Sequence, residues 1–332
     1  MVTFILFIAG FVLLIIGAEW LIDGAASIAK KRGISNIVIG LTIVALGTSS
    51  PELVVNLIAT LQGADDVAMG NILGSNISNL LLILGISAII YPLAVNSNTK
   101  WKEVPMAIAA SIIIAILAND DWFAPGITVS QISRHNGIIL IFFFLMFMYY
   151  AFTIAKIDDG HGAVQVKQYP LWKSVWMIPL GIGGMALGGK WIVDGAIEIA
   201  AMFGMSQALI SLTIVAVGTS LPELATCVVA AYKKNPGIVI GNIVGSNIFN
   251  VFFIIGISAV VKPLAFNKEM NFDLLVGIFA SVLLFVFLFL PRRKILERWQ
   301  GGVLLALYFG YILVLVLRET GAITLGFLTY QS

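Results

Sequence analysis

The chain has 332 residues, of which 60% are hydrophobic and 11% are charged, and its formal net charge is +2. Soluble domains carry about 25% charged residues, so this composition excludes a soluble enzyme and a disordered chain. The small net charge argues against a nucleic-acid partner, and the one cysteine excludes a disulfide framework. The composition is that of an integral membrane protein surrounded by a lipid bilayer.

Apolar segments of about 17–25 residues are long enough to cross a bilayer as helices. The first is expected to be retained, because no small-residue cleavage site follows it. The predicted fold is all-α, with ten transmembrane helices joined by short connections. The predicted spans are residues 3–22, 37–61, 67–91, 104–118, 137–155, 174–194, 208–232, 237–261, 273–290 and 302–317.

The distribution of Lys and Arg predicts the orientation. Fourteen of these residues lie in one set of alternate connections and four in the other, while Lys190 falls within a span. Cytoplasmic connections carry the excess of Lys and Arg. The protein is therefore predicted to be a multi-pass protein of the cell (inner or plasma) membrane with both termini on the extracytoplasmic side.

An internal repeat relates the two halves at an offset of 171 residues. Residues 41–52, LTIVALGTSSPE, match residues 212–223 at ten of twelve positions, and 70–79, GNILGSNISN, match 241–250 at eight of ten. Each copy contains five spans, an odd number, so the second copy must enter the membrane in the opposite orientation. Inverted-topology repeats are typical of secondary transporters.

The repeat predicts the domain organisation. Residues 1–155 form the first five-helix repeat, 156–173 a short cytoplasmic connection, and 174–332 the second, inverted five-helix repeat.

Two acidic residues lie near the middle of otherwise apolar spans. Glu52 and Glu223 are repeat mates, and a carboxylate at that depth costs about 2.5–3.5 kcal/mol. Each should face a protein-lined cavity and meet a cation. The alternative is a structural pair with a basic residue, but spans two, three, seven and eight contain none away from their ends.

Each glutamate ends a GTSxPE motif. Pro51 cannot donate to the carbonyl of Gly47, so the helix is predicted to break there, and Pro222 repeats the arrangement. Freed carbonyls, the adjacent Thr and Ser hydroxyls and the carboxylate then form a cluster of oxygens. A plain proline kink is the alternative.

A second motif, GSNIxN, places Ser75 and Asn79 four residues apart on one helical face. Ser246 and Asn250 match them in the second copy, while the intervening Asn76 and Asn247 are interpreted as structural. The combined donors are all oxygens, which suit Ca²⁺, Mg²⁺ or alkali ions rather than zinc or copper. Two carboxylates neutralise one divalent ion, which favours Ca²⁺.

The two motifs, each present twice, resemble the α-repeats of the cation/Ca²⁺ exchanger superfamily, in particular its prokaryotic calcium/sodium antiporters. The resemblance implies Na⁺/Ca²⁺ antiport by alternating access, with three Na⁺ per Ca²⁺ and therefore electrogenic. It implies no enzymatic activity, no cofactor besides the transported ions and no obligatory protein partner.

The resemblance also implies the ion ligands. It assigns the shared acidic ligands to Glu52 and Glu223, and a central amide to Asn79. Position 250 departs from some relatives, which have Asp where this chain has Asn250, and this argues against K⁺ dependence. The implied side-chain oxygen ligands of flanking Na⁺ sites are Thr48, Ser49, Ser75, Thr219, Ser220 and Ser246, and the implied main-chain carbonyl ligands are Ala45 and Ala216.

Three alternatives remain open. An H⁺-coupled Ca²⁺ exchanger would share the glutamates, although six hydroxyls favour Na⁺ because a proton needs no cage of oxygens. An intramembrane enzyme lacks support, because no adjacent carboxylate pair or Ser/His pairing is present in a span. A channel would conduct Ca²⁺ without a counter-ion gradient.

Overall fold

The structure, a computed structural model, describes residues 2–119, 130–153, 167–202, 218–290 and 295–319. Within these residues the regular structure is helical apart from four strands of two residues each. This agrees with the predicted all-α class, and the short strands were not predicted.

The chain divides into two compact units. The first comprises Met1–Pro51 and Met148–Ser246, and the second comprises Glu52–Phe147 and Asn247–Ser332. Each unit therefore combines segments from both predicted repeats, and the division falls inside three helices.

The helices of the first unit include the short π-helical segment η1. They are α1 (Val2–Arg32), α2 (Asn36–Ile39), η1 (Gly40–Val44), α3 (Ala45–Thr48), α9 (Leu171–Met202), α12 (Leu221–Tyr232) and most of α13 (Pro236–Phe249).

The second unit contains most of α4 and α8 and several short π and 3₁₀ segments. Its helices are α4 (Ser50–Gln62), α5 (Asp65–Ile77), η2 (Ser78–Ile83), α6 (Leu84–Ile90), η3 (Thr99–Glu103), α7 (Val104–Ala118), α8 (Arg134–Thr153), η6 (Asn250–Ile255), α14 (Gly256–Val261), η7 (Lys268–Met270), α15 (Asn271–Phe287) and α16 (Arg298–Glu319).

Eight helices of the described residues are long and apolar enough to cross a membrane, or nine if Asn36–Thr48 and Ser50–Gln62 form one broken span. The predicted span 208–232 lies partly outside the described residues, and its described part is the 12-residue α12. The count of ten therefore stays a prediction.

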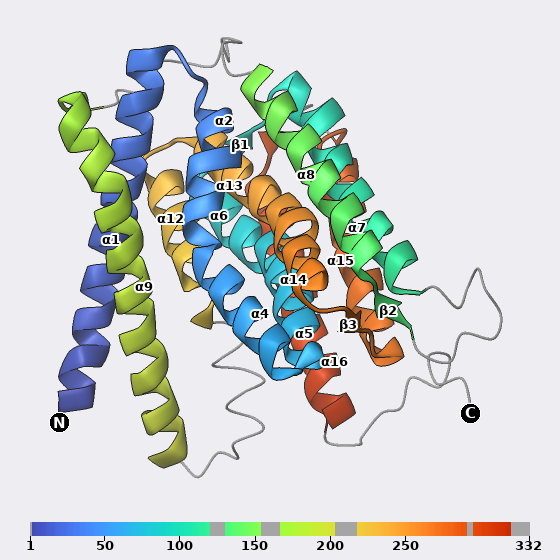
Figure 1. Cartoon of the computed structure of the whole chain (residues 1–332). Coiled ribbons are helices and arrows are strands. Elements are labelled where there is room, and N and C mark those ends of the chain that lie inside the picture. Colours follow the sequence, from blue (N-terminus) through green and yellow to red (C-terminus); the bar gives the residue numbers. More distant parts are fainter. Residues whose placement is uncertain (1, 120–129, 154–166, 203–217, 291–294, 320–332) are drawn as a thin grey trace. The chain divides into compact units, whose positions relative to one another are not determined.

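Glycines allow α1 and α9 to pack closely and antiparallel in the first unit (Figure 1). A Cβ atom built on Gly17 would lie 2.7 Å from the main-chain oxygen of Gly181. One built on Gly188 would lie 2.7 Å from the main-chain oxygen of Gly10. The glycines of α1 match those of α9 at the offset of 171, so the same contact occurs twice with the two helices exchanged.

Two antiparallel strand pairs repeat in the same way within the second unit. β1 (Leu93–Ala94) pairs with β4 (Ile295–Leu296), and β3 (Leu264–Ala265) pairs with β2 (Gln131–Ile132) (Figure 1). β3 is the repeat mate of β1. Each pair joins two connections that the Lys and Arg distribution assigns to the same side of the membrane.

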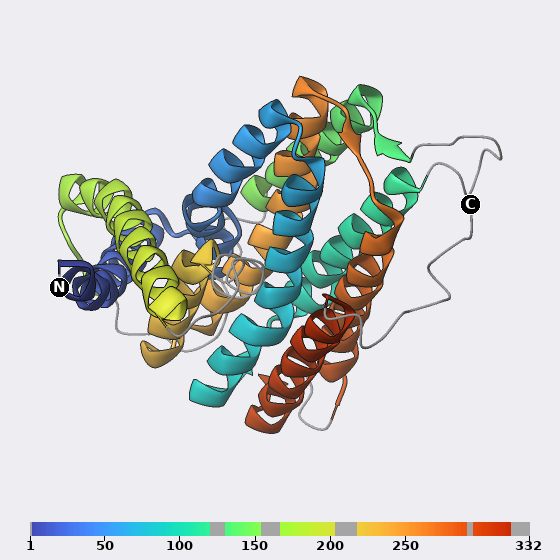
Figure 2. The same ribbon diagram turned by 90° about the horizontal axis from the view of Figure 1, so that it is seen from below.

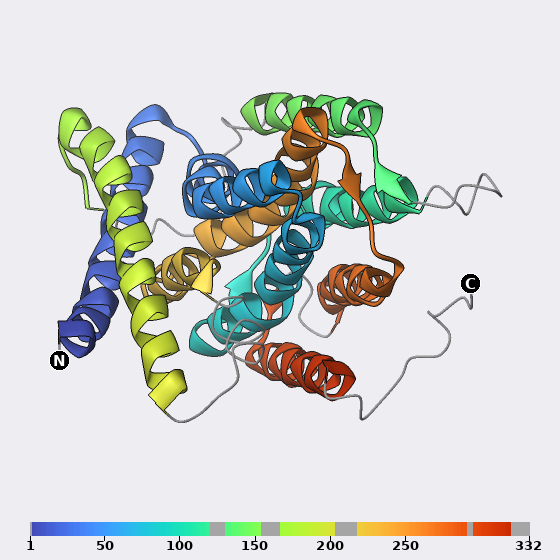
Figure 3. The same cartoon turned by 60° about the horizontal axis from the view of Figure 1, so that its bottom comes forward.

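Helix packing in the second unit also uses glycine. α15 lies beside α7 (Figure 2), and α16, in red, lies beside α6 (Figure 3). A Cβ atom on Gly301 of α16 would lie 2.7 Å from the oxygen of Gly85, and one on Gly137 of α8 would lie 2.7 Å from that of Gly256. Gly85 and Gly256 are repeat mates. Small residues at such contacts let helix backbones approach, which is how transmembrane helices associate.

Large apolar side chains lie on the outside of several helices. Ile8, Phe142 and Leu313 are 67%, 60% and 58% exposed. Apolar surface on this scale is costly in water and is covered by lipid in a membrane protein.

Candidate ion-binding site

The first GTSxPE motif interrupts a helix, with a bend of 46° between Asn36–Thr48 and Ser50–Gln62, and a helix begins at the matching position of the second motif. Ser49 ends α3 with φ −86° and ψ 7°, and its repeat mate Ser220 precedes α12 with φ −87° and ψ 5°. This sparsely populated conformation is common at functional sites. A proline follows two residues later in each copy, where its missing N–H prevents a continuous helix. The predicted break is therefore confirmed in the first copy, whereas residues 203–217, which precede the second, lie outside the described residues.

Each motif places a glutamate in the first turn of a helix. Glu52 lies in the first turn of α4, and Glu223 in the first turn of α12. Their side chains are 1% and 2% exposed. The positive end of a helix dipole stabilises a carboxylate in its first turn, which lowers the cost of burying the charge.

In the first unit, Glu223 is bound by a hydroxyl from the other motif. Ser49 Oγ donates a 2.8 Å hydrogen bond to Oε1 of Glu223. The second carboxylate oxygen, Oε2, is buried and has no hydrogen-bond partner within the described part of the chain. No Lys or Arg among the described residues forms an ion pair with Glu223. This carboxylate therefore retains a free acceptor, as a cation ligand requires.

Thr48 is oriented by an asparagine that the sequence analysis did not select. Its Oγ1 donates to Oδ1 of Asn242 at 3.1 Å, and Nδ2 of Asn242 donates to the sulfur of Cys227 at 3.3 Å. The Thr48 hydroxyl also lies 3.4 Å from the main-chain oxygen of Ala45, which is a second acceptor for its one proton. The duplication of Asn242 as Asn71 within the GNIxGSNIxN motif could have identified it.

The other predicted hydroxyl ligands are also largely inside the protein. Ser75, Ser220 and Ser246 are buried, and Thr219 is half-buried. Ser246 Oγ has no hydrogen-bond partner among the described residues. Of the predicted carbonyl ligands, Ala45 is buried one turn before Ser49, whose N–H donates to it at 3.0 Å. Ala216 lies outside the described residues.

In the second unit, four asparagines from the two GSNIxN motifs form one hydrogen-bond network. Asn79 Nδ2 donates to Oδ1 of Asn247 at 2.9 Å, and Asn250 Nδ2 donates to Oδ1 of Asn76 at 3.0 Å. Asn76 and Asn247 also donate to each other's main-chain oxygen, at 3.4 and 3.3 Å. The arrangement brings the predicted ligands Asn79 and Asn250 into one network, which the interpretation of Asn76 and Asn247 as merely structural did not foresee.

Both asparagine motifs run into π-helical segments, η2 after the first and η6 after the second. A π-helical turn inserts an extra residue into the helical register and occurs often at functional sites. The paired π segments therefore mark the same part of the two copies.

No three His, Cys, Asp or Glu side chains gather anywhere in the described residues. A cation bound by either motif glutamate would therefore also depend on neutral oxygens, which the hydroxyls and amides of the motifs supply.

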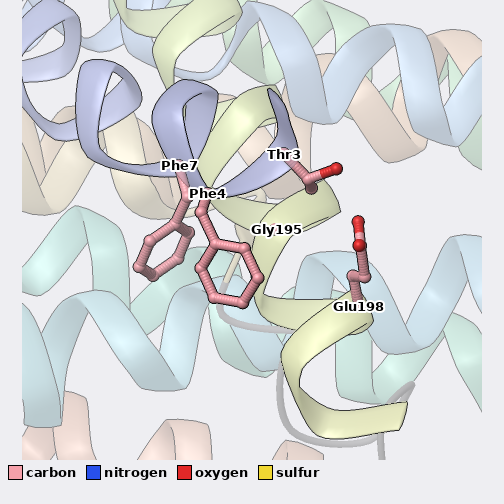
Figure 4. Close-up of a pocket in the computed structure, with 5 residues that line it drawn as sticks. All are labelled: Thr3, Phe4, Phe7, Gly195 and Glu198. Carbon is pink, nitrogen blue, oxygen red and sulfur yellow. The ribbon is translucent and has the colours of Figure 1, made fainter. Parts of the chain in front are cut away.

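A shallow crevice lies elsewhere in the first unit, between the start of α1 and the end of α9 (Figure 4). It contains none of the predicted ligands. Its lining residues are Thr3, Phe4, Phe7, Gly195 and Glu198.

Apolar helices of membrane-spanning length and a buried acid in the first turn of both α4 and α12 define a multi-pass α-helical membrane transporter. Residues 2–153 and 173–317 match the family described as "Sodium/calcium exchanger protein". The chain belongs to this sodium/calcium exchanger family.

Individual relatives support the assignment over nearly the whole chain. The putative antiporter CaxA of Alkalimonas amylolytica is 36% identical, with 94% of this chain and 98% of CaxA covered. The sodium/calcium exchanger MaX1 of Methanosarcina acetivorans is 30% identical, with 95% and 98% covered. A structure of the sodium-calcium exchanger NCX_Mj, soaked with Na⁺ and Sr²⁺, matches with a TM-score of 0.80 and 31% identity, covering 93% of this chain and 97% of that one.

Proposed function

We propose that the protein is a secondary antiporter that exchanges Na⁺ for Ca²⁺ across the cell membrane. The observation that carries the proposal is the pair of buried glutamates, Glu52 and Glu223, each in the first turn of a helix. Membership of the sodium/calcium exchanger family supports both substrates.

The proposed ligand set is the one that the motifs predict. The two glutamates bind Ca²⁺ or Na⁺ in turn, so occupancy by one ion displaces the other. The buried oxygens Oε2 of Glu223 and Oγ of Ser246, which lack partners within the described residues, support this assignment, since buried polar groups are otherwise paired. The remaining proposed ligands are Asn79, Asn250, Thr48, Ser49, Ser75, Thr219 and Ser220 by side chain and Ala45 and Ala216 by main chain.

The proposed mechanism is alternating access in a ten-helix, inverted-repeat fold. The antiparallel packing of α1 and α9 through matched glycines supports oppositely inserted copies. Spans one and six, which contain these helices, would slide past the ion-binding spans to open either side. Coupling requires that the site without an ion, which holds two carboxylates, rarely reorients.

Exchange of three Na⁺ for one Ca²⁺ moves one net charge per cycle, which couples transport to the membrane potential by about 2.3 kcal/mol per 100 mV. The strand pairs support the assigned sides, because each joins connections predicted to share one side of the membrane. Both termini are accordingly proposed to be extracytoplasmic.

The test is ⁴⁵Ca²⁺ uptake by proteoliposomes at the same pH inside and outside. Uptake should require Na⁺ inside and be accelerated by an interior-positive potential, because net positive charge leaves with Na⁺. Glu52→Gln proteoliposomes provide the inactive control. Uptake driven by a proton gradient without Na⁺ would replace the proposal with H⁺-coupled exchange, and uptake without either gradient would indicate a channel.

A further inference from the structure

The asparagine network fixes the orientation of four buried amide groups. All four side chains are at most 7% exposed. Asn76 and Asn247 each donate Nδ2 to the other's main-chain oxygen. A carbonyl oxygen can only accept, so each of these amides must direct its NH₂ group toward that carbonyl.

The opposite end of each amide is thereby fixed as an oxygen. Oδ1 of Asn76 accepts from Nδ2 of Asn250, and Oδ1 of Asn247 accepts from Nδ2 of Asn79. Asn250 and Asn79 must therefore present their NH₂ groups to the network and turn their own oxygens away from it. These two oxygens, Oδ1 of Asn79 and Oδ1 of Asn250, are buried and have no hydrogen-bond partner in the described part of the chain.

We propose that Asn76 and Asn247 are positioning residues that hold the ligand amides with oxygen, not nitrogen, available to the transported cation. Asn76 fixes the amide orientation of Asn250, and Asn247 fixes that of Asn79. Each positioning residue therefore acts on the ligand amide of the other repeat. This inference rests on the proposed function, in which Asn79 and Asn250 bind the ions. A flipped ligand amide would direct an NH₂ group at the cation and repel it.

The geometry makes the two positioning effects separable. Asn76→Ala removes the acceptor for Asn250 but leaves the main-chain oxygen of residue 76, to which Asn247 donates. Asn247 therefore keeps its orientation, and so does Asn79. Asn76→Ala should therefore release the amide orientation of Asn250 alone.

A carboxylate removes the need for positioning, because it presents an oxygen in either orientation. Asn250→Asp should therefore abolish the effect of Asn76→Ala, whereas Asn79→Asp should leave that effect in place. Asn247→Ala should show the reverse pattern. If Asn76 and Asn247 served only in packing, each alanine variant would lose the same Ca²⁺ affinity in both Asp backgrounds. Packing does not depend on which ligand has been changed to a carboxylate.

The experiment is equilibrium ⁴⁵Ca²⁺ binding to the purified full chain, with each asparagine variant alone and in the two Asp backgrounds. Asn76→Ala should weaken Ca²⁺ binding about tenfold, which corresponds to about 1.4 kcal/mol. In the Asn250→Asp background the loss should disappear. Asn119→Ala is the matched control, because Asn119 exchanges amide hydrogen bonds of 2.8 and 2.9 Å with Asn271 in the same unit, and neither residue is a proposed ligand.

Folding is checked by monodispersity and thermal unfolding, and Asn76→Ser replaces the alanine variant if the latter does not fold. Unchanged Ca²⁺ binding in Asn76→Ala, or an equal loss in both Asp backgrounds, overturns the positioning role and leaves the proposed function intact. Absence of Ca²⁺ binding in the wild-type chain, or full binding in Glu52→Gln and Glu223→Gln, overturns the proposed function and the inference with it.

Discussion

Ser49 Oγ donates a 2.8 Å hydrogen bond to Oε1 of Glu223, so a hydroxyl from the motif of the first repeat holds the carboxylate of the second. The two repeats are thus chemically joined within the first unit, and not only related by sequence. The hydroxyl uses its proton for Glu223, so its lone pairs can still bind the proposed Na⁺ ion.

Ser49→Ala should therefore raise the Na⁺ concentration needed for half-maximal Ca²⁺ exchange about tenfold, or about 1.4 kcal/mol, because it removes a proposed Na⁺ ligand and the hydroxyl that holds Glu223 in place. Ser50→Ala is the control on the next residue, since its hydroxyl donates to the main-chain oxygen of Leu46 at 2.7 Å rather than to a carboxylate. Na⁺ dependence of ⁴⁵Ca²⁺ uptake measures both. Equal shifts in the two variants would contradict a specific role for Ser49.

Glu52→Gln and Glu223→Gln should each reduce Na⁺-driven Ca²⁺ uptake about a hundredfold, because each removes a charge-assisted ligand. Both should stay folded, since a neutral amide of the same shape is cheaper to bury than a carboxylate. Addition of Ca²⁺ should raise the melting temperature of the wild-type chain through ligand binding and leave that of the variants unchanged.

Glu198→Gln provides the control for charge removal, because Glu198 lines the shallow crevice and is not a proposed ligand. Near-normal exchange in both Glu52→Gln and Glu223→Gln would refute the site.

Asn250→Asp should introduce a pH dependence of Ca²⁺ binding. The amide of Asn250 donates to Oδ1 of Asn76 at 3.0 Å, and a carboxylate cannot donate. When the introduced carboxyl group is protonated, it can donate this hydrogen bond again. When it is ionised, the Asn76 oxygen repels it, but its negative charge attracts Ca²⁺. Ca²⁺ affinity should therefore rise with pH in Asn250→Asp more steeply than in the wild-type chain. Identical pH profiles of ⁴⁵Ca²⁺ binding at acidic and neutral pH would show that residue 250 is not a ligand.

The sequence predicts the helix breaks because their cause is local. A proline lacks the N–H of a helical hydrogen bond, and α3 ends at Thr48 in the first copy while α12 begins after Ser220 in the second. Proline alone is not sufficient, since Pro179 lies inside α9 without ending it. The burial of the glutamates also follows from the sequence, since each acid lies inside an apolar span.

The asparagine network was not predicted, although part of its signal is present in the sequence. Asn76 and Asn79 are three residues apart, and side chains at this spacing are neighbours on a helix. The interpretation of Asn76 and Asn247 as structural did not use this spacing. The reciprocal bonds to Asn247 and Asn250 depend on two distant helices meeting in a particular register, which no single-sequence pattern specifies.

The short strands were missed for a different reason. β1 and β3 contain two residues each, which is too few to show the alternation that predicts a strand. Their pairing partners are set by the tertiary fold.

Gly181→Ala should destabilise the protein by about 1–3 kcal/mol, because overpacking at a close helix contact forces the backbones apart. A Cβ atom at Gly181 would lie 2.6 Å from the main-chain oxygen of Gly17 and 2.8 Å from the nitrogen of Leu21, and neither atom can rotate away. Gly183→Ala is the matched control two residues along α9, where an added Cβ atom meets nothing within 4 Å among the described residues. It should be neutral or stabilise by up to about 1 kcal/mol, since alanine favours the helix more than glycine does. Thermal unfolding in one detergent measures both variants. A melting temperature for Gly181→Ala at or above that of Gly183→Ala would contradict the close, glycine-dependent contact between α1 and α9.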